Sequence, residues 1–158
     1  MEILASEFAR QLKEASRSAR PLEARWEIRE SRVPLGRAKL RLRPCGARRW
    51  PRRWGLSVAR WFPREAGISA VRLGDLAILS WPGEPTSELG FAARAAALEA
   101  GAGGAWLLGL TNDHLAYFTT SGEYERGGYE ACASLYGPDS GERIAAALGT
   151  LARELFAR

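Results

Sequence analysis

The sequence predicts an α/β fold in which a mixed β-sheet is flanked by helices. Amphipathic helical periodicity occupies both ends of the chain, and apolar runs of strand length lie between them, separated by glycine and proline. The 158 residues are enough for one domain with a real core. Because 46% of the residues are hydrophobic and 26% are charged, the composition is that of a globular protein. We therefore expect residues 1–158 to form a single α/β domain.

The amino-terminal part predicts one helix followed by one strand. Leu4, Phe8 and Leu12 recur with helical spacing, so residues 2–17 should form an amphipathic helix. Apolar and charged residues then alternate over residues 24–33, which is typical of a half-buried strand.

Residues 36–67 predict an irregular insert that is basic and rich in tryptophan. Prolines interrupt it, and arginine alternates with tryptophan in the stretch Arg48–Arg60. Such a pattern can bind bases or an anionic surface. The favoured alternative is a short helix and turn over residues 54–62 that covers the sheet, with solvated arginines. Nucleic acid is therefore an unlikely partner, even at a net charge of +5.

The second half predicts a hairpin, a crossover helix and a further strand. The expected elements are strands at 68–73 and 76–80 joined by Gly74-Asp75, a helix over 85–100, a buried strand at 106–110, and a final helix that follows a cap at Asp139.

Three side chains that could bind a metal or take part in catalysis follow the ends of the two central strands. Glu84 comes after the strand at 76–80, and His114 and Tyr117 come after the strand at 106–110. A strand-helix-strand unit brings such ends to one edge of a sheet. Carboxylate and phenolate oxygens can bind zinc, and a phenol can also donate a hydrogen bond to developing charge. The same residues also have a structural explanation as turn and helix-start signals.

Polar residues around these three side chains are candidate neighbours of the site. They are Asn112, Asp113, Thr119, Thr120 and Tyr124.

Several motifs in this region, taken in order, resemble the neutral/alkaline ceramidase family. They are Ile68–Leu79 leading into Pro82-Gly83-Glu84-Pro85-Thr86, then Gly109–Tyr117, Thr119-Thr120, Glu123-Tyr124, Tyr129-Glu130-Ala131 and Leu135-Tyr136-Gly137-Pro138. The resemblance extends over about seventy residues.

The resemblance implies a zinc amidase that cleaves the N-acyl bond of ceramide with metal-bound water. It assigns Glu84 and Tyr117 as zinc ligands, whereas His114 stands where the family usually has another tyrosine, so no ligand role passes to it. The two histidine ligands of the family belong to an earlier half, which residues 1–80 do not supply. The chain therefore resembles the carboxy-terminal half of the catalytic domain, and we expect no hydrolytic zinc site in this chain alone.

Three functions remain open at this point. The first is a ceramidase-like half domain of an amidohydrolase that acts on an N-acyl lipid. It either pairs with a separately encoded amino-terminal half or is a fragment of a longer gene. The second is a non-catalytic remnant that self-associates as a homo-oligomer to cover exposed edges and apolar patches. The third is a nucleic-acid or anionic-surface binder acting through Arg48–Arg60.

Composition adds expectations about the environment of the protein. Cys45 and Cys132 are too few and too far apart for a disulfide framework, which favours two reduced thiols in a cytoplasmic protein. No apolar run approaches the length of a membrane span or a signal peptide core. The arginine-rich, glutamine-poor composition suits a thermophilic source.

Overall fold

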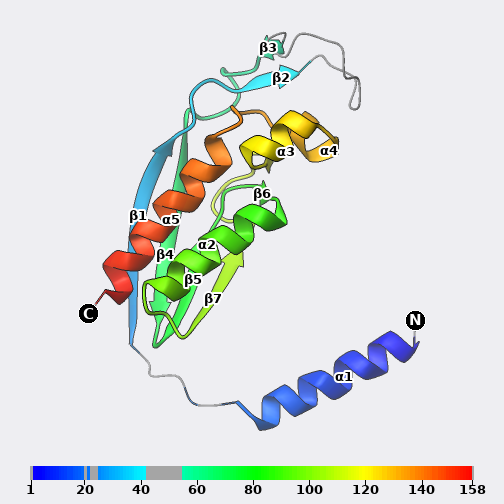
Figure 1. The fold of residues 1–158 in the computed structure, drawn as a ribbon, viewed down its shortest axis with the longest axis vertical. Helices are drawn as coiled ribbons and strands as arrows, with labels where there is room; N and C mark the ends of the chain where they lie inside the picture. The colour runs from blue at the N-terminus through cyan, green and yellow to red at the C-terminus, as the bar shows by residue number, and fades with distance from the viewer. Residues whose placement is uncertain (1, 20, 22–24, 42–54, 158) are drawn as a thin grey trace.

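The architecture is a four-stranded mixed sheet with two helices packed on one of its faces. The computed structural model describes residues 2–19, 21, 25–41 and 55–157. The sheet contains β1 (Trp26–Pro34), β4 (Glu65–Leu73), β5 (Leu76–Ser80) and β7 (Gly104–Leu108) in the order β1-β4-β5-β7. Helices α2 (Ser87–Glu99) and α5 (Ser140–Phe156) lie together against it (Figure 1). The predicted mixed α/β fold is confirmed.

Local sequence explains how the strands connect. Gly74 has a φ of 61°, which suits glycine in the two-residue turn between β4 and β5 and makes that pair antiparallel. The chain then crosses over through α2, so that β7 pairs with β5 in parallel. Because these two strands run in the same direction, the segments that follow them leave from one edge of the sheet.

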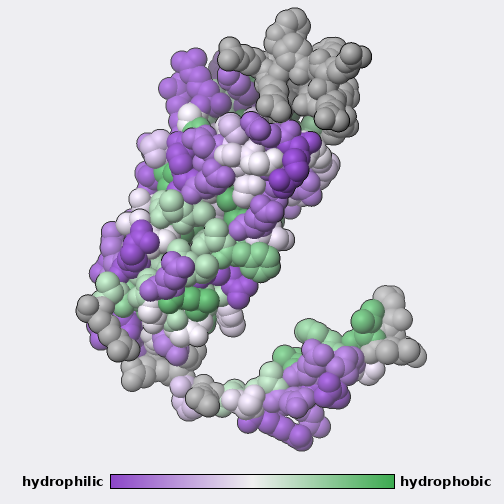
Figure 2. Space-filling view, in the orientation of Figure 1, coloured by the Kyte–Doolittle hydropathy of each residue, from purple (hydrophilic) through white to green (hydrophobic). Residues whose placement is uncertain are grey.

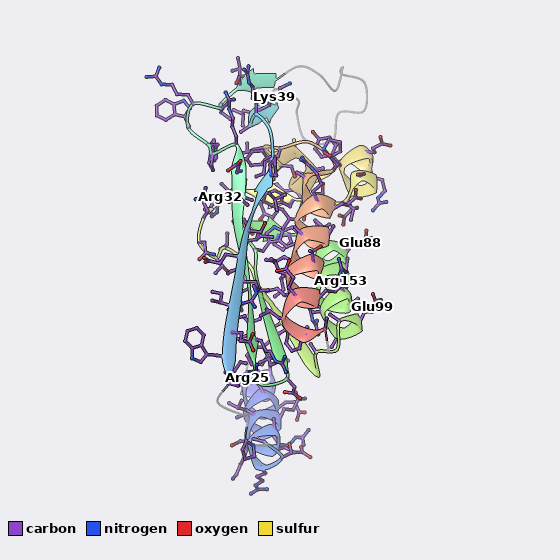
Figure 3. The ribbon with its side chains drawn as sticks, turned by 90° about the vertical axis from the view of Figure 1, so that its left-hand side faces the viewer. Arg25, Arg32, Lys39, Glu88, Glu99 and Arg153 are labelled. Carbon is purple, nitrogen blue, oxygen red and sulfur yellow. The ribbon has the colours of Figure 1, made fainter. Side chains whose placement is uncertain are left out.

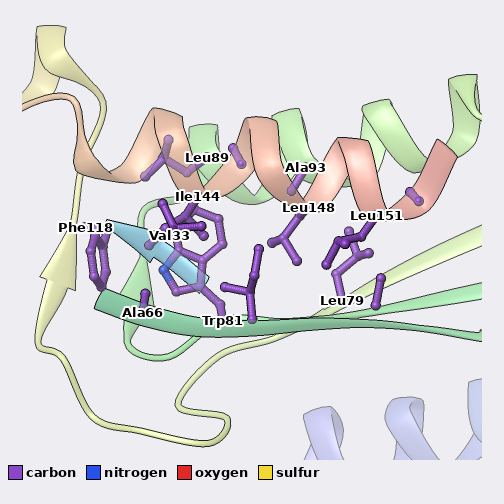
Figure 4. Close-up of a cluster of buried hydrophobic side chains, with 14 of the residues drawn as sticks. Val33, Ala66, Leu79, Trp81, Leu89, Ala93, Phe118, Ile144, Leu148 and Leu151 are labelled. Atoms are coloured by element: carbon purple, nitrogen blue, oxygen red, sulfur yellow. The ribbon is translucent and has the colours of Figure 1, made fainter. Parts of the chain in front are cut away.

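A hydrophobic core fills the space between the sheet and the helices (Figure 4). Trp81 and Leu79 contribute from the sheet side and are fully buried. Leu89 comes from α2, and Ile144 and Leu148 come from α5, all with at most 1% of their surface exposed. This packing holds β5, β7 and their connecting helix in fixed positions, which also fixes the edge that carries the candidate site.

Helix α1 (Glu2–Arg17) is separate from this core. It projects away from the sheet (Figure 1), and within the described residues it packs extensively on no other element. Leu4, Phe8 and Leu12 on its apolar side are 76%, 69% and 61% exposed. Of the helices that the structure describes, none combines the length and the apolar character needed to cross a membrane.

The described part of residues 36–67 differs from the expected helix and turn. Strands β2 (Lys39–Arg41) and β3 (Gly55–Ser57) form a small antiparallel sheet of their own. A turn follows at residues 59–62, and β4 begins at Glu65, inside the predicted insert. Residues 42–54, which hold most of the arginine and tryptophan stretch, lie outside the described residues.

Several predicted boundaries also change. Pro85 belongs to a short strand rather than to the helix, because α2 begins after its N-cap residue Thr86. Strand β7 begins at Gly104, two positions before the predicted strand. Asp139 precedes α5 but makes no side-chain capping bond. Helices α3 (Ser121–Arg126) and α4 (Tyr129–Ala133) occupy a passage that was predicted to be a loop.

Cys132 in α4 is disulfide-bonded. The expectation of two reduced thiols is therefore wrong for this residue, because separation along the sequence does not determine which cysteines meet in the fold. Cys45 lies outside the described residues.

Candidate functional site

The candidate site lies where the chain leaves the carboxyl ends of β5 and β7. Beyond these ends the two segments pair again as β6 (Glu84–Pro85) and β8 (Tyr117–Phe118), which are parallel. Glu84 and Tyr117 are direct partners in this small sheet. Two residues that are far apart in the sequence are therefore held side by side by backbone pairing.

Backbone hydrogen bonds fix the segment between β5 and Glu84 against the segment after β7. The Trp81 N–H donates to the carbonyl of Leu108 over 2.8 Å, and the Glu84 N–H donates to the carbonyl of Ala116 over 2.9 Å. Gly83 permits this close approach, because a Cβ atom at this position would lie 2.5 Å from the Ala116 oxygen. The backbone at the site is therefore tightly constrained.

Glu84 and Tyr117 interact directly. The Tyr117 hydroxyl hydrogen bonds to the Glu84 carboxylate, and this bond, together with burial and the negative charge, raises the pKa of Tyr117 to about 12. His114 lies beside them, with its Nε2 atom 3.9 Å from Oε1 of Glu84. The side chain of His114 is 70% exposed and that of Glu84 is 39% exposed, so the group faces solvent.

An open cavity of 590 Å³ adjoins the group. Its lining includes Tyr117, the buried Thr119, and Glu123, Arg126 and Glu130 from the short helices. The site therefore presents negatively charged carboxylates as well as a positively charged guanidinium to a molecule that enters the cavity.

Glu123 connects the site to the start of α2. Its Oε2 atom accepts hydrogen bonds from the Thr86 hydroxyl over 2.7 Å and from the Thr120 N–H over 2.8 Å. Thr120 and Glu123 also form a complete capping box at the start of α3. Burial opposes ionisation of this carboxyl, but the hydrogen bonds from Thr120 and Thr86 prevail and lower its pKa.

The predicted neighbours do not all lie together. Thr119 lines the cavity, and Thr120 caps the adjoining helix. Asn112 and Asp113 line a different cavity, of 510 Å³, beside β1 and β4. Tyr124 lies in α3 and is not among the residues that line the 590 Å³ cavity.

Two further residues of the site belong to one of the family motifs, but no site role was predicted for them from the sequence. The ring of Tyr129 meets the ring of Tyr117 edge to face, with centroids 5.4 Å apart. Glu130 lines the cavity and adds negative charge near Tyr117. The motif Tyr129-Glu130-Ala131 was the available signal, but residue spacing could not show that α4 folds back toward β8.

The residues present do not by themselves fit a catalytic zinc ion. Within the described part of the chain, no group of three or more histidine, cysteine, aspartate or glutamate residues is arranged to hold a metal. Glu84 and Tyr117 supply two oxygen donors, and His114 is the only histidine in the sequence. A catalytic zinc takes three protein ligands and most often includes histidines. Any metal site here therefore needs donors from outside the described residues.

Sequence comparisons relate this chain to ceramidases. The profile of the family described as neutral/alkaline non-lysosomal ceramidase, N-terminal, matches residues 51–144. Neutral ceramidase 3 of Arabidopsis thaliana is 36% identical over 85 residues, and a neutral ceramidase of Oryza sativa subsp. japonica is 36% identical over 87 residues. Each alignment covers 49% of this chain. The matched regions make up only 12% and 11% of those two proteins.

Solved structures show the same fold. A ceramidase complexed with C2 superposes with a TM-score of 0.78 at 19% identity, covering 98% of this chain and 34% of that chain. The neutral ceramidase of Pseudomonas aeruginosa gives a TM-score of 0.71 at 20% identity, covering 91% of this chain and 30% of its own. This chain thus spans about a third of each solved relative.

Proposed function

Because the chain belongs to the neutral/alkaline non-lysosomal ceramidase family, we propose that it supplies part of the active site of a ceramidase-like amidohydrolase. Its substrate is an N-acyl amide such as ceramide. The chain corresponds to the carboxy-terminal half of the catalytic domain. The remaining part, on another polypeptide or elsewhere in a longer gene product, completes the site.

The pairing of Glu84 with Tyr117 carries this proposal. The family resemblance assigns both residues as ligands, and they are direct partners in a parallel pair whose backbone is held by hydrogen bonds. Two oxygen donors held side by side at the edge of an open cavity can bind the same metal ion. Histidines from the remaining part of the domain would complete a zinc site, and a zinc ion held there would activate water as a nucleophile.

The chain's own residues position the substrate. Arg126 and the carboxylates of Glu123 and Glu130 line the cavity, so they offer hydrogen-bonding partners to the polar part of an N-acyl lipid. In the metal-free chain the Tyr117 hydroxyl keeps its proton at neutral pH, because its hydrogen bond to Glu84 raises its pKa to about 12, and a zinc ion bound to both oxygens would replace that proton.

Mixing this chain with a polypeptide that carries the remaining part of the domain tests the proposal. We expect one zinc ion per complex by elemental analysis, and hydrolysis of a fluorescent short-chain ceramide by the mixture but by neither component alone. Glu84→Gln should lower the rate about 100-fold or more. The matched control Glu99→Gln, at an exposed position of α2, should leave it unchanged. A mixture without zinc and without activity would contradict the proposal and favour the non-catalytic remnant.

A further inference from the structure

The four-stranded sheet has a second face that no helix of the described residues covers. Figure 3 shows α2 and α5 on one side of the sheet and no helix against the other. The residues of β4 that point toward the helices, Ala66, Ile68 and Ala70, are at most 2% exposed. Because side chains alternate along a strand, the residues between them point to the opposite face.

Apolar residues form a continuous row across this opposite face, which we call the outer sheet face. The strand register places Ile28 beside Val71, Val71 beside Ile78, and Ile78 beside Trp106, so the row crosses all four strands. Ile28 is 42% exposed and Trp106 is 60% exposed. Trp26 and Leu108 extend the face, with exposures of 68% and 46%. A sheet normally covers such a face with a second layer.

The outer sheet face has the composition of an interface. Its apolar centre ends at one side in Glu30 and Arg32, which line the 510 Å³ cavity together with Asp113. An apolar centre with a polar rim is the usual arrangement where two protein surfaces meet. The strand register places this end of the face at the carboxyl ends of β5 and β7, from which the chain continues to the segments that carry Glu84 and Tyr117.

Helix α1 presents a second uncovered apolar surface. Figure 2 shows hydrophobic residues along one side of this helix and hydrophilic residues along the other. Leu4, Phe8 and Leu12 are the large members of the apolar side. The helix stands apart from the four-stranded sheet with α2 and α5, which we call the body. The superposition on a solved ceramidase nevertheless covers 98% of this chain, and only 34% of that protein. Most of that longer chain lies outside the part shared with this one, so it can provide a partner for this helix.

We propose that the outer sheet face and the apolar side of α1 together bind the polypeptide that carries the rest of the ceramidase-like catalytic domain. This inference rests on the proposed function and names its docking surface. The occupant presents an apolar layer that lies across the row from Ile28 to Trp106 and also contacts α1. Its end then lies at the sheet edge that holds Glu84 and Tyr117, where it can supply the missing histidines.

Binding measurements with matched variants test this surface. The probe is the polypeptide of the source genome that matches the remaining part of the ceramidase family, titrated by sedimentation velocity. Ile28→Ser and Trp106→Ser should each weaken the complex at least about tenfold, because central apolar contacts dominate interfaces. Leu98→Ser, at a residue of α2 that is 46% exposed, removes a similar aliphatic surface on the helix side and should change affinity less than about twofold. Circular dichroism melts confirm that the variants fold.

The outcomes separate this inference from the proposed function. Equal effects of Ile28→Ser and Leu98→Ser, or the absence of a complex, would each overturn the surface. Self-association of this chain that is lost in Ile28→Ser would overturn it in favour of a second copy. Zinc content and ceramide hydrolysis are measured in the same mixtures. If the complex is weakened by Ile28→Ser but binds no zinc, only the proposed function is contradicted. If the mixture hydrolyses ceramide equally well with Ile28→Ser, only the proposed docking surface is contradicted.

Discussion

At the scale of single residues, the hydrogen bond between Glu84 and Tyr117 determines the protonation state of Tyr117. The carboxylate accepts from the phenol, so the neutral phenol is favoured and its pKa is raised to about 12. Without a metal, Tyr117 is therefore a hydrogen-bond donor at neutral pH rather than a phenolate. A metal ion that bound both oxygens would have to displace this proton.

We expect Glu84→Gln to move the pKa of Tyr117 back toward the ordinary value of 10.0, because the main cause of the shift is removed. The metal-free protein labelled with ¹³Cζ-tyrosine and titrated by NMR would report each ring separately. Tyr136 is an internal control, since its pKa of about 12 arises first from burial and then from Asp113. Equal changes at Tyr117 and Tyr136 would contradict the assignment.

The same shift has a consequence for stability at high pH. The native state holds the Tyr117 proton more tightly than the unfolded chain, so this stabilisation is complete below pH 10 and is lost as the pH rises toward about 12. Urea unfolding across this window should show a steeper loss of stability in the wild type than in Glu84→Gln. Parallel curves for the two proteins would argue against the linkage.

Gly83 is the residue on which the backbone geometry of the site most depends. In Gly83→Ala the new Cβ atom would lie 2.5 Å from the Ala116 oxygen and 2.8 Å from Cε2 of Phe118. We expect a loss of about 1–3 kcal/mol in the free energy of unfolding, because the paired segments must separate. Gly67→Ala in β4 is the matched control, since its Cβ atom would meet nothing within 4 Å. Similar unfolding midpoints for both variants would contradict this explanation.

At the scale of elements, long periodic segments were predictable and short ones were not. The helices at 2–17 and 140–156 and the hairpin around Gly74 follow from side-chain periodicity and turn chemistry, which are local properties. Strands β6 and β8 have two residues each, and one residue of β6 is a proline. Their existence depends on the placement of β5 and β7, so no local pattern could reveal them.

The candidate site was predictable to a similar degree. The convergence of Glu84 with Tyr117 followed from expecting parallel strands, but their direct pairing needed the register of β6 and β8. The Thr120 to Glu123 spacing of a capping box could have predicted the start of α3. It was missed because that helix has only six residues and the polar passage looked like a loop.

Glu123 should matter for stability as well as for the shape of the cavity. We expect Glu123→Ala to cost about 1–3 kcal/mol, since it removes one half of the capping box and leaves the Thr86 hydroxyl without its acceptor. The pKa of Glu123 is lowered, so this difference should be present above pH 4.5 and should shrink as the pH falls below it. Chemical unfolding at pH 7 and pH 3 measures both effects. Glu99→Ala provides an exposed control, and a difference that is constant with pH would contradict the assignment.

At the scale of the whole molecule, one core stabilises the body and α1 stands outside it. All the buried residues between the sheet and the helices belong to a single cluster that includes α2 and α5 but no residue of α1. A helix of 16 residues that packs extensively on no other described element is marginally stable in water. We therefore expect the stability of the chain in isolation to come from the sheet with α2 and α5, and little of it from α1.

Two leucine substitutions test this division of stability. Leu148 in α5 is fully buried, so Leu148→Ala should lower the free energy of unfolding by about 2–5 kcal/mol through lost burial and a cavity. Leu12→Ala removes the same atoms from a side chain that is 61% exposed in α1, and it should change stability by less than about 0.5 kcal/mol. Urea unfolding followed by tryptophan fluorescence compares them under one condition. A large loss for Leu12→Ala in the isolated chain would mean that α1 packs on the body in solution, and the surface assigned to a partner would then be covered by the chain itself.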